Sequence, residues 1–146
     1  MGSSERGRLN RGMDTLTPTD LDFLRRPLHG FLTVAGGQPR PVWFEATADG
    51  TLQLFSEPDA PKVRRLRRNP RASLVVAAPV GERERWVSAE GTVSLEPDGA
   101  HDLAGRLAAR YWDLGDPGRA AGLKEILAVD QLRLVLHPEK VRRYAY

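Results

Sequence analysis

The sequence predicts a mostly β fold of the α+β class, in which six antiparallel strands form a small closed or split β-barrel with flanking helices. Six short apolar runs are separated by turns or by short helical segments. Tight turns join several neighbouring runs, and Asp49-Gly50 is the strongest of these because both residues tolerate positive φ. No Gly-x-Gly-x-x-Gly run follows a strand, so a dinucleotide-binding parallel sheet is not expected.

Local signals place one helix and three strands in the first third of the chain. Thr17 offers a hydroxyl N-cap, Pro18 suits the first turn, and Pro27 ends the helix. Three apolar runs follow in close succession, separated by turns that contain glycine, and they predict an antiparallel meander. We expect its strands at residues 30–34, 39–46 and 51–56.

The middle of the chain combines a basic helix with an apolar strand. Pro61 can open a helix, and the pair Asn69-Pro70 stops it. The run at residues 72–78 is almost continuously apolar, which is typical of a strand that is buried on both faces.

The second half of the chain predicts two more strands with two helices between them. The strand at residues 85–95 alternates, and Gly91 within it indicates a bulge or a close backbone approach. Helical spacing of apolar residues predicts helices at 99–112 and 119–128. The sixth strand is expected at residues 131–137, and the polar, aromatic segment 141–146 can pair as an edge extension.

Length and composition indicate one domain. Residues 1–12 of the 146 are polar and lack periodicity, so we expect a disordered tail there and a single domain at residues 13–146. The absence of Cys excludes disulfides and thiolate metal ligands. No run of about 18 apolar residues and no signal-peptide pattern occurs. We therefore expect a cytoplasmic protein with no membrane partner.

The basic charge of the chain is local. The formal net charge is only +3, although six basic residues lie between Lys62 and Arg71. This cluster fits a solvated helix face, a nucleic-acid patch or an anion site. Few aromatic residues interleave there for base stacking, so we do not expect nucleic acid as a partner.

Lys62 is the best candidate for binding an anion. It lies in the first turn of the expected helix, where free N–H groups and the helix dipole already present positive charge. A Lys there, followed by Arg64 and Arg65, destabilises the bare helix because like charges meet. A bound phosphate or carboxylate explains the arrangement, and a solvated basic face is the alternative.

The same segment carries a resemblance to a known family. Lys62 opens the helix, Leu66 follows four residues later, and Asn69-Pro70 precedes a small residue and an apolar strand. The chain resembles the pyridoxamine 5'-phosphate oxidase-like flavin-binding split barrels over residues 17–146, and it is most similar to their small branch that uses the deazaflavin coenzyme F-420 or FMN. Supporting matches are Gly37 with Pro39, residues 41–44 before the Asp-Gly turn, and Glu90-Gly91-Thr92.

The resemblance implies an oxidoreductase that transfers a hydride between coenzyme F-420, or FMN, and a small organic substrate. It also implies a homodimer, because the family's cofactor sites form between two subunits. The phosphate falls at Lys62 and Ser56, and the ring faces residues 41–44. The residues that the resemblance and the basic helix mark as cofactor-binding are Lys62, Ser56, Arg64, Pro41, Val42, Trp43, Phe44 and Phe55.

The chain departs from the family pattern in two places. The FMN-using oxidases have Arg immediately before the Lys, where this chain has Pro61, so a bidentate phosphate contact is missing. This departure favours the deazaflavin over FMN. The C-terminal segment that binds pyridoxal phosphate in the true oxidases is not recognisable, so oxidation of pyridoxamine phosphate is not expected. A flavin-binding or haem-binding sensor without turnover is the alternative function.

The sequence does not identify a catalytic acid or base. Glu45 and Glu57 lie near the expected site and are either proton relays or, more simply, exposed carboxylates. Trp86, like Trp43 and Phe44, either borders a ring-binding cleft or belongs to the core. The three histidines lack metal-ligand spacing and are interpreted as incidental: His29, His101 and His137.

Overall fold

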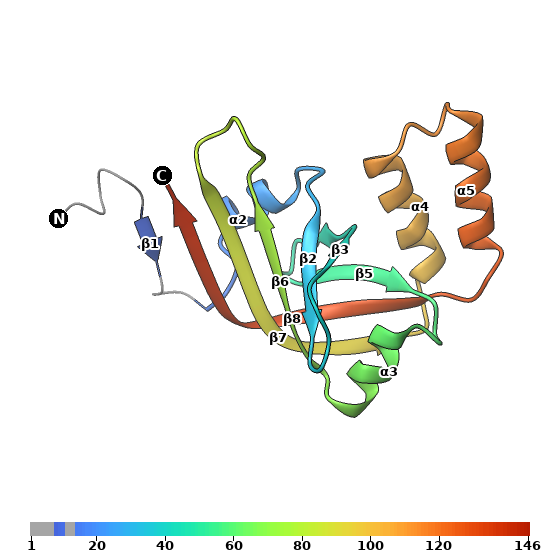
Figure 1. Cartoon of the computed structure of the whole chain (residues 1–146), viewed down its shortest axis with the longest axis horizontal. Helices are drawn as coiled ribbons and strands as arrows, with labels where there is room; N and C mark the ends of the chain where they lie inside the picture. The colour runs from blue at the N-terminus through green and yellow to red at the C-terminus, as the bar shows by residue number, and fades with distance from the viewer. Residues whose placement is uncertain (1–7, 11–13) are drawn as a thin grey trace.

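Eight strands of the described chain form one sheet, and four helices lie on or beside it (Figure 1). The computed structural model describes residues 8–10 and 14–146. In chain order the elements are β1 (Arg8–Asn10), α2 (Pro18–Leu24), β2 (Gly30–Val34), β3 (Arg40–Val42), β4 (Glu45–Ala46), β5 (Leu52–Ser56), α3 (Pro61–Arg68), β6 (Arg71–Ala77), β7 (Arg85–Glu96), α4 (Ala100–Tyr111), α5 (Pro117–Leu127) and β8 (Leu132–Ala145).

The two edge strands of the sheet are neighbours in the chain. The strand order is β3-β2-β6-β7-β8-β5-β4, with β1 added on β8 and every pairing antiparallel. Strands β3 and β4 stand at opposite ends of this order, yet only Trp43 and Phe44 separate them. The three Cα steps from Val42 to Glu45 span at most about 11 Å. The sheet must therefore curl until its edges approach each other, which makes it a split barrel.

The curl of the sheet is most evident in strands β7 and β8, which both bend sharply along their length (Figure 1). The register of this pair shifts between Glu90 and Gly91. A Cβ placed on Gly91 would lie 1.9 Å from the carbonyl oxygen of His137, so the two backbones can approach this closely only at a glycine. The bulge predicted at Gly91 is confirmed.

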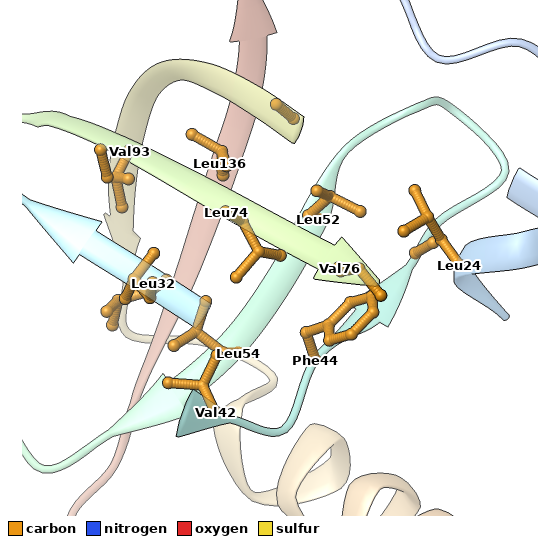
Figure 2. Close-up of a cluster of buried hydrophobic side chains, with 14 of the residues drawn as sticks. Leu24, Leu32, Val42, Phe44, Leu52, Leu54, Leu74, Val76, Val93 and Leu136 are labelled. Carbon is orange, nitrogen blue, oxygen red and sulfur yellow. The ribbon is translucent and has the colours of Figure 1, made fainter. Parts of the chain in front are cut away.

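The concave side of the curl holds the hydrophobic core (Figure 2). Leu52, Leu74 and Leu136 come from three different strands and are each 1% exposed, and Phe44 between the two edges is fully buried. Burying each such side chain stabilises the fold by about 1.5–3 kcal/mol. The core therefore holds the two edges of the sheet together from the inside.

The structure confirms the mostly β antiparallel class and the order of strands and helices, with differences in detail. The strand predicted at residues 39–46 is divided into β3 and β4, because Trp43 and Phe44 leave the ladder. With β1, this gives eight strands rather than six. The segment 141–146 is not a separate extension, since β8 continues to Ala145.

The prediction that residues 72–78 are buried on both faces is wrong. Buried and exposed residues alternate along β6, and Val75 on the outer face is 37% exposed. Apolar residues on that face are therefore not evidence of burial within one chain. The tail expected to be disordered, residues 1–12, falls mostly outside the described residues, although Arg8–Asn10 within it form β1.

Helices α4 and α5 form a hairpin that follows β7 and precedes β8 in the chain and lies to one side of the sheet (Figure 1). Arg106 of α4 donates to both carboxylate oxygens of Glu45, at 2.8 Å from Nε and 3.1 Å from Nη2. These hydrogen bonds lower the pKa of Glu45. The contact fixes α4 against the β4 edge. None of the described helices is long and apolar enough to cross a membrane.

A buried ion pair fixes α2 to β8. Thr17 and Asp20 form the capping box that begins α2: the Thr17 hydroxyl accepts from the Asp20 N–H at 3.1 Å, and Asp20 Oδ2 accepts from the Thr17 N–H at 2.8 Å. The same carboxylate accepts from Arg143 Nη2 at 2.8 Å and is only 2% exposed. Burial alone would raise the pKa of Asp20, but the hydrogen bonds from Arg143 and Thr17 outweigh it and hold the pKa below its usual value.

We predict that Asp20→Asn lowers the free energy of unfolding by about 3 kcal/mol near neutral pH, because the charge of Arg143 stays buried without its carboxylate. Since the folded-state pKa of Asp20 is depressed, its stabilisation is complete above about pH 4 and is lost as the pH falls through the folded-state value. Urea unfolding at several pH values checks both points. Asp22→Asn, which breaks an exposed pair with Arg25, is the control and should cost less than about 0.5 kcal/mol. Equal losses for the two variants would contradict the prediction.

Candidate functional site

A hollow of about 300 Å³ opens where the two edges of the sheet approach each other. Its walls come from β3, β5, the first turn of α3 and the residues that flank β2 and β3, so it exists only because the sheet curls. We call it the ring hollow. It is lined by His29, Pro41, Val42, Trp43, Leu54, Phe55 and Lys62.

A second hollow of about 480 Å³ lies directly beside the first, and we call it the outer hollow. Pro41 and Lys62 line both hollows, so the Lys62 side chain stands at their boundary. The outer hollow is mostly apolar, with Arg65 as a further cation from α3. Its lining residues are Leu32, Val34, Gly37, Gln38, Arg40, Pro41, Pro61, Lys62 and Arg65.

Lys62 is a desolvated cation without a counterion in the described part of the chain. It occupies the first turn of α3, and the N-cap residue Ala60 supplies no side-chain hydrogen bond to that turn. Burial lowers the pKa of Lys62, because desolvation disfavours the charged ammonium. Among the described residues, none accepts a hydrogen bond from the Lys62 ammonium. A ligand anion in either hollow would supply the missing negative charge.

The other cations of α3 divide into two groups. Arg64 is exposed and donates from Nη1 to the carbonyl oxygen of Asp59 at 2.7 Å, away from both hollows. Arg65 lines the outer hollow, and its Nη1 lies 3.2 Å from where a Cβ on Gly37 would stand. The basic helix in the sequence suggested Arg64, whereas the structure places Arg65 beside Lys62 in the lining of the outer hollow. The buried face of α3 runs through Val63 and Leu66, as the apolar pattern of the sequence indicates. Which of the Arg residues reaches the outer hollow depends on the strands that pack beside α3, and the sequence does not give these.

An aromatic cluster fixes the Trp43 wall of the ring hollow. The indole of Trp43 stacks on Tyr111 with centroids 5.3 Å apart and planes 3° apart. Trp112 packs edge-on against the same indole at 4.7 Å, and Phe55 does so at 6.4 Å. The C-terminal end of α4 therefore holds Trp43 in one orientation, and such aromatic pairs each add about 0.5–1.5 kcal/mol.

The hydroxyl of Tyr111 ties three segments together at the split. It donates to the carbonyl oxygen of Leu28 at 2.6 Å and accepts from the Phe44 N–H at 3.4 Å. Leu28 precedes β2, and Phe44 belongs to the junction between β3 and β4. The Tyr111 hydroxyl thus provides hydrogen-bond partners for a backbone carbonyl and a backbone N–H that lie outside the strand pairings.

The structure brings five of the eight predicted cofactor-binding residues to the ring hollow. These five are Lys62, Pro41, Val42, Trp43 and Phe55. Phe44 instead points into the core with its ring fully buried, and the Ser56 hydroxyl donates to the Glu57 carbonyl oxygen at 3.1 Å. In the chain as described, Phe44, Ser56 and Arg64 line neither hollow.

Three other candidates from the sequence have clear structural positions. Trp86 stacks on Tyr144 at 6.2 Å, away from the ring hollow. Glu45 is engaged by Arg106, which removes it as a free proton relay. His29 was interpreted as incidental, but it lines the ring hollow. The sequence offered no signal for it, because its place depends on β2 and β3 pairing. No cluster of three potential metal-ligating side chains occurs within residues 8–10 and 14–146.

Comparison with known proteins identifies the family and the fold of the chain. The family described as pyridoxamine 5'-phosphate oxidase matches residues 16–143. No curated protein matches the sequence.

Three solved structures illustrate the fold likeness. A conserved hypothetical protein of Mycobacterium tuberculosis is 19% identical, with 93% of this chain and 89% of that chain covered and a TM-score of 0.66. A protein named F-420 reductase is 23% identical, covering 82% and 93%, with a TM-score of 0.62. A FAD-binding protein of Mesorhizobium loti is 22% identical, covering 96% and 98%, with a TM-score of 0.61. At these identities the likeness establishes the fold alone.

We predict that Tyr111→Phe lowers the free energy of unfolding by about 1–2 kcal/mol, because the Leu28 carbonyl and the Phe44 N–H lose their partner while the stack on Trp43 remains. Chemical denaturation followed by Trp fluorescence measures the change. Tyr146→Phe removes a hydroxyl from a side chain that is 54% exposed, and it should leave stability unchanged. A Tyr111→Phe protein as stable as the Tyr146→Phe control would refute the role given to this hydroxyl.

Proposed function

The chain belongs to the pyridoxamine 5'-phosphate oxidase family, and from this premise we propose that it is an oxidoreductase that holds a flavin or deazaflavin cofactor and passes a hydride between it and a small organic substrate. The observation that carries the proposal is the desolvated ammonium of Lys62, which stands between two hollows without a counterion among the described residues. A phosphate-bearing cofactor supplies that counterion, and the adjoining ring hollow is walled by aromatic side chains. The residues present therefore fit such a group.

Each part of the site has a distinct task in this proposal. Lys62 binds the cofactor phosphate, and the first turn of α3 adds the positive end of the helix dipole. Trp43 and Phe55 would flank the ring and exclude water from it. Tyr111 and Trp112 hold the orientation of Trp43, and Phe55 packs edge-on against the same indole. The bound cofactor supplies the hydride chemistry.

We further propose coenzyme F-420 rather than FMN as the natural cofactor. Pro61 stands where the FMN-using oxidases have Arg, so the bidentate phosphate contact of those enzymes has no counterpart here. The oligoglutamate tail of the deazaflavin is polyanionic, and α3 presents Arg65 in the outer hollow and Arg67 and Arg68 on its exposed face. Charge complementarity along α3 therefore favours the deazaflavin.

A homodimer is the proposed assembly. Phe31 of β2 and Val75 of β6 lie directly opposite each other in the sheet and are 47% and 37% exposed. An apolar cross-strand pair on an outer sheet face is costly in water and is buried well by a second copy of the same face. The small-molecule substrate would then enter at the split.

We expect separate fluorescence titrations with FMN and with coenzyme F-420 to give micromolar binding of one of them. Lys62→Ala should weaken that binding at least tenfold, or about 1.4 kcal/mol, because the phosphate loses its charged partner. Lys124→Ala removes an exposed Lys from α5 and is the matched control, with no expected change. Equal binding by the two variants would place the phosphate elsewhere. Tight binding without turnover would favour a sensor over an enzyme.

We expect the wild-type protein to sediment as a dimer and Phe31→Asp to sediment as a monomer, since a charge in the centre of the apolar face opposes its burial. Val80→Asp, on an exposed turn between β6 and β7, is the control and should remain dimeric. Analytical ultracentrifugation at micromolar concentration makes the measurement. A monomeric wild type, or a dimeric Phe31→Asp protein, would rule out this face as the interface.

A further inference from the structure

His29 has an unusual position in the ring hollow. Of the seven residues that line this hollow, His29 and Lys62 are the two that can carry a proton as acids or bases near neutral pH or above. The other five are Pro41, Val42, Trp43, Leu54 and Phe55, none of which titrates. Lys62 is assigned to the cofactor phosphate, so His29 is the group left to exchange a proton with whatever reacts there.

The backbone on both sides of His29 is held firmly. The carbonyl oxygen of Leu28 accepts the 2.6 Å hydrogen bond from the Tyr111 hydroxyl. Gly30 pairs with Val42 on one side and with Val76 on the other. A Cβ on Gly30 would lie 2.8 Å from the Leu74 side chain, so this backbone is pressed against the core. The imidazole is therefore presented to the hollow from a fixed anchor, as a reacting group requires.

The imidazole of His29 has both nitrogens available. Within residues 8–10 and 14–146, neither nitrogen takes part in a hydrogen bond or ion pair, and the imidazole packs at an angle on the Tyr111 ring with centroids 5.6 Å apart. The other two histidines are engaged: His101 Nε2 lies 2.8 Å from the Val129 carbonyl oxygen, and His137 Nε2 lies 2.9 Å from Ser94 Oγ. The His29 residue is exposed, so solvent can reach its imidazole.

The charged and titratable groups around His29 have other roles. Tyr111 faces it from α4 but commits its hydroxyl proton to Leu28. Lys62 shares the hollow from α3. The guanidinium of Arg110 is bound to the carbonyl oxygens of Leu24 and Arg26, at the end of α2. None of the three is both free to transfer a proton and suited to do so near pH 7.

We propose that His29 is the catalytic proton donor of the reduction, an inference that rests on the proposed function. Reduction of an organic acceptor by two electrons adds one hydride, from the reduced cofactor, and one proton. The protonated imidazole supplies the proton: an N–H bond of His29 breaks, and an O–H or C–H bond forms on the atom of the acceptor that gains negative charge. A bound reduced cofactor would supply the hydride and with it both electrons that the acceptor gains, and solvent water returns the proton to His29.

The first test follows the three histidines by NMR. The imidazole carbon resonances are titrated with pH in the free protein and with saturating FMN or coenzyme F-420, whichever binds, and His29→Asn assigns the signal. We expect the cofactor to shift the His29 resonance and the midpoint of its pH titration. The resonances of His101 and His137, which lie outside the ring hollow, should stay unchanged. A His29 signal that is unaffected by a saturating cofactor would overturn the proposal.

The second test measures turnover with menadione, a quinone whose reduction consumes one proton for each hydride. Under anaerobic conditions with pre-reduced cofactor, His29→Asn should slow the reaction about 100-fold, within the usual range for loss of a general acid. The wild-type rate should fall as the pH rises through the midpoint of His29, and the variant should lose this dependence. His101→Asn is the control and should match the wild type.

The outcomes separate this inference from the proposed function. Cofactor binding by His29→Asn should stay within about threefold of wild type, because Lys62 holds the phosphate. If the cofactor binds and His29→Asn turns over menadione as fast as wild type, His29 is not the donor, whereas the proposed function stands. If neither cofactor binds the wild-type protein, or if the bound cofactor reduces menadione no faster than free cofactor, the proposed function fails and this inference with it.

Discussion

The connection of β3 to β4 through only Trp43 and Phe44 is the constraint on which the rest of the structure depends. These strands are the opposite edges of the sheet, so a two-residue junction forces the whole sheet to curl. The two junction residues point to opposite sides of the curled sheet. Phe44 is fully buried in the core, whereas Trp43 faces the ring hollow. The split in the barrel and the candidate site are therefore the same feature.

Two further features of the structure accompany the approach of the two sheet edges. The glycine at position 91 lets β7 and β8 approach each other closely where their register shifts. The hairpin of α4 and α5, which connects these two strands in the chain, is held at the β4 edge by a series of polar contacts. Arg106 binds Glu45, Gln53 Nε2 donates to Glu45 at 2.7 Å, and Arg133 donates to Gln53 at 3.1 Å. In this network the Glu45 carboxylate accepts from both Arg106 and Gln53, and the Gln53 side-chain oxygen accepts from Arg133. The network therefore orients α4 and leaves the charge of Glu45 paired.

The sequence was informative where structure is decided locally. The N-cap at Thr17, the stop at Asn69-Pro70 and the bulge at Gly91 each follow from the chemistry of one or two residues, and the structure has all three. The position of Lys62 in a first helical turn is of the same kind. These local signals, together with the succession of strands and helices along the chain, were enough to indicate the fold class and to suggest Lys62 as a site residue.

Features that depend on distant contacts could not be read from the pattern. At the division of residues 39–46, the Phe44 N–H donates to the hydroxyl of Tyr111, which lies 67 residues away. The positions of Arg65 and His29 in the lining of the two hollows depend on which strands stand beside α3 and β2. The apolar residues on the outer face of β6 suggested burial within one chain. An apolar pattern predicts that a face is covered, but it does not show whether the same chain or another molecule covers it.

We propose that the ring hollow, which is walled by β3 and β5 at the split, holds a phosphate-bearing redox cofactor through Lys62. A crystal structure of the protein grown with saturating coenzyme F-420, or FMN if only FMN binds, tests it most directly. We expect a phosphate oxygen within about 3 Å of Lys62 Nζ and the ring system beside Trp43 and Phe55. Cofactor density remote from α3, with Lys62 left facing solvent, would contradict the claim.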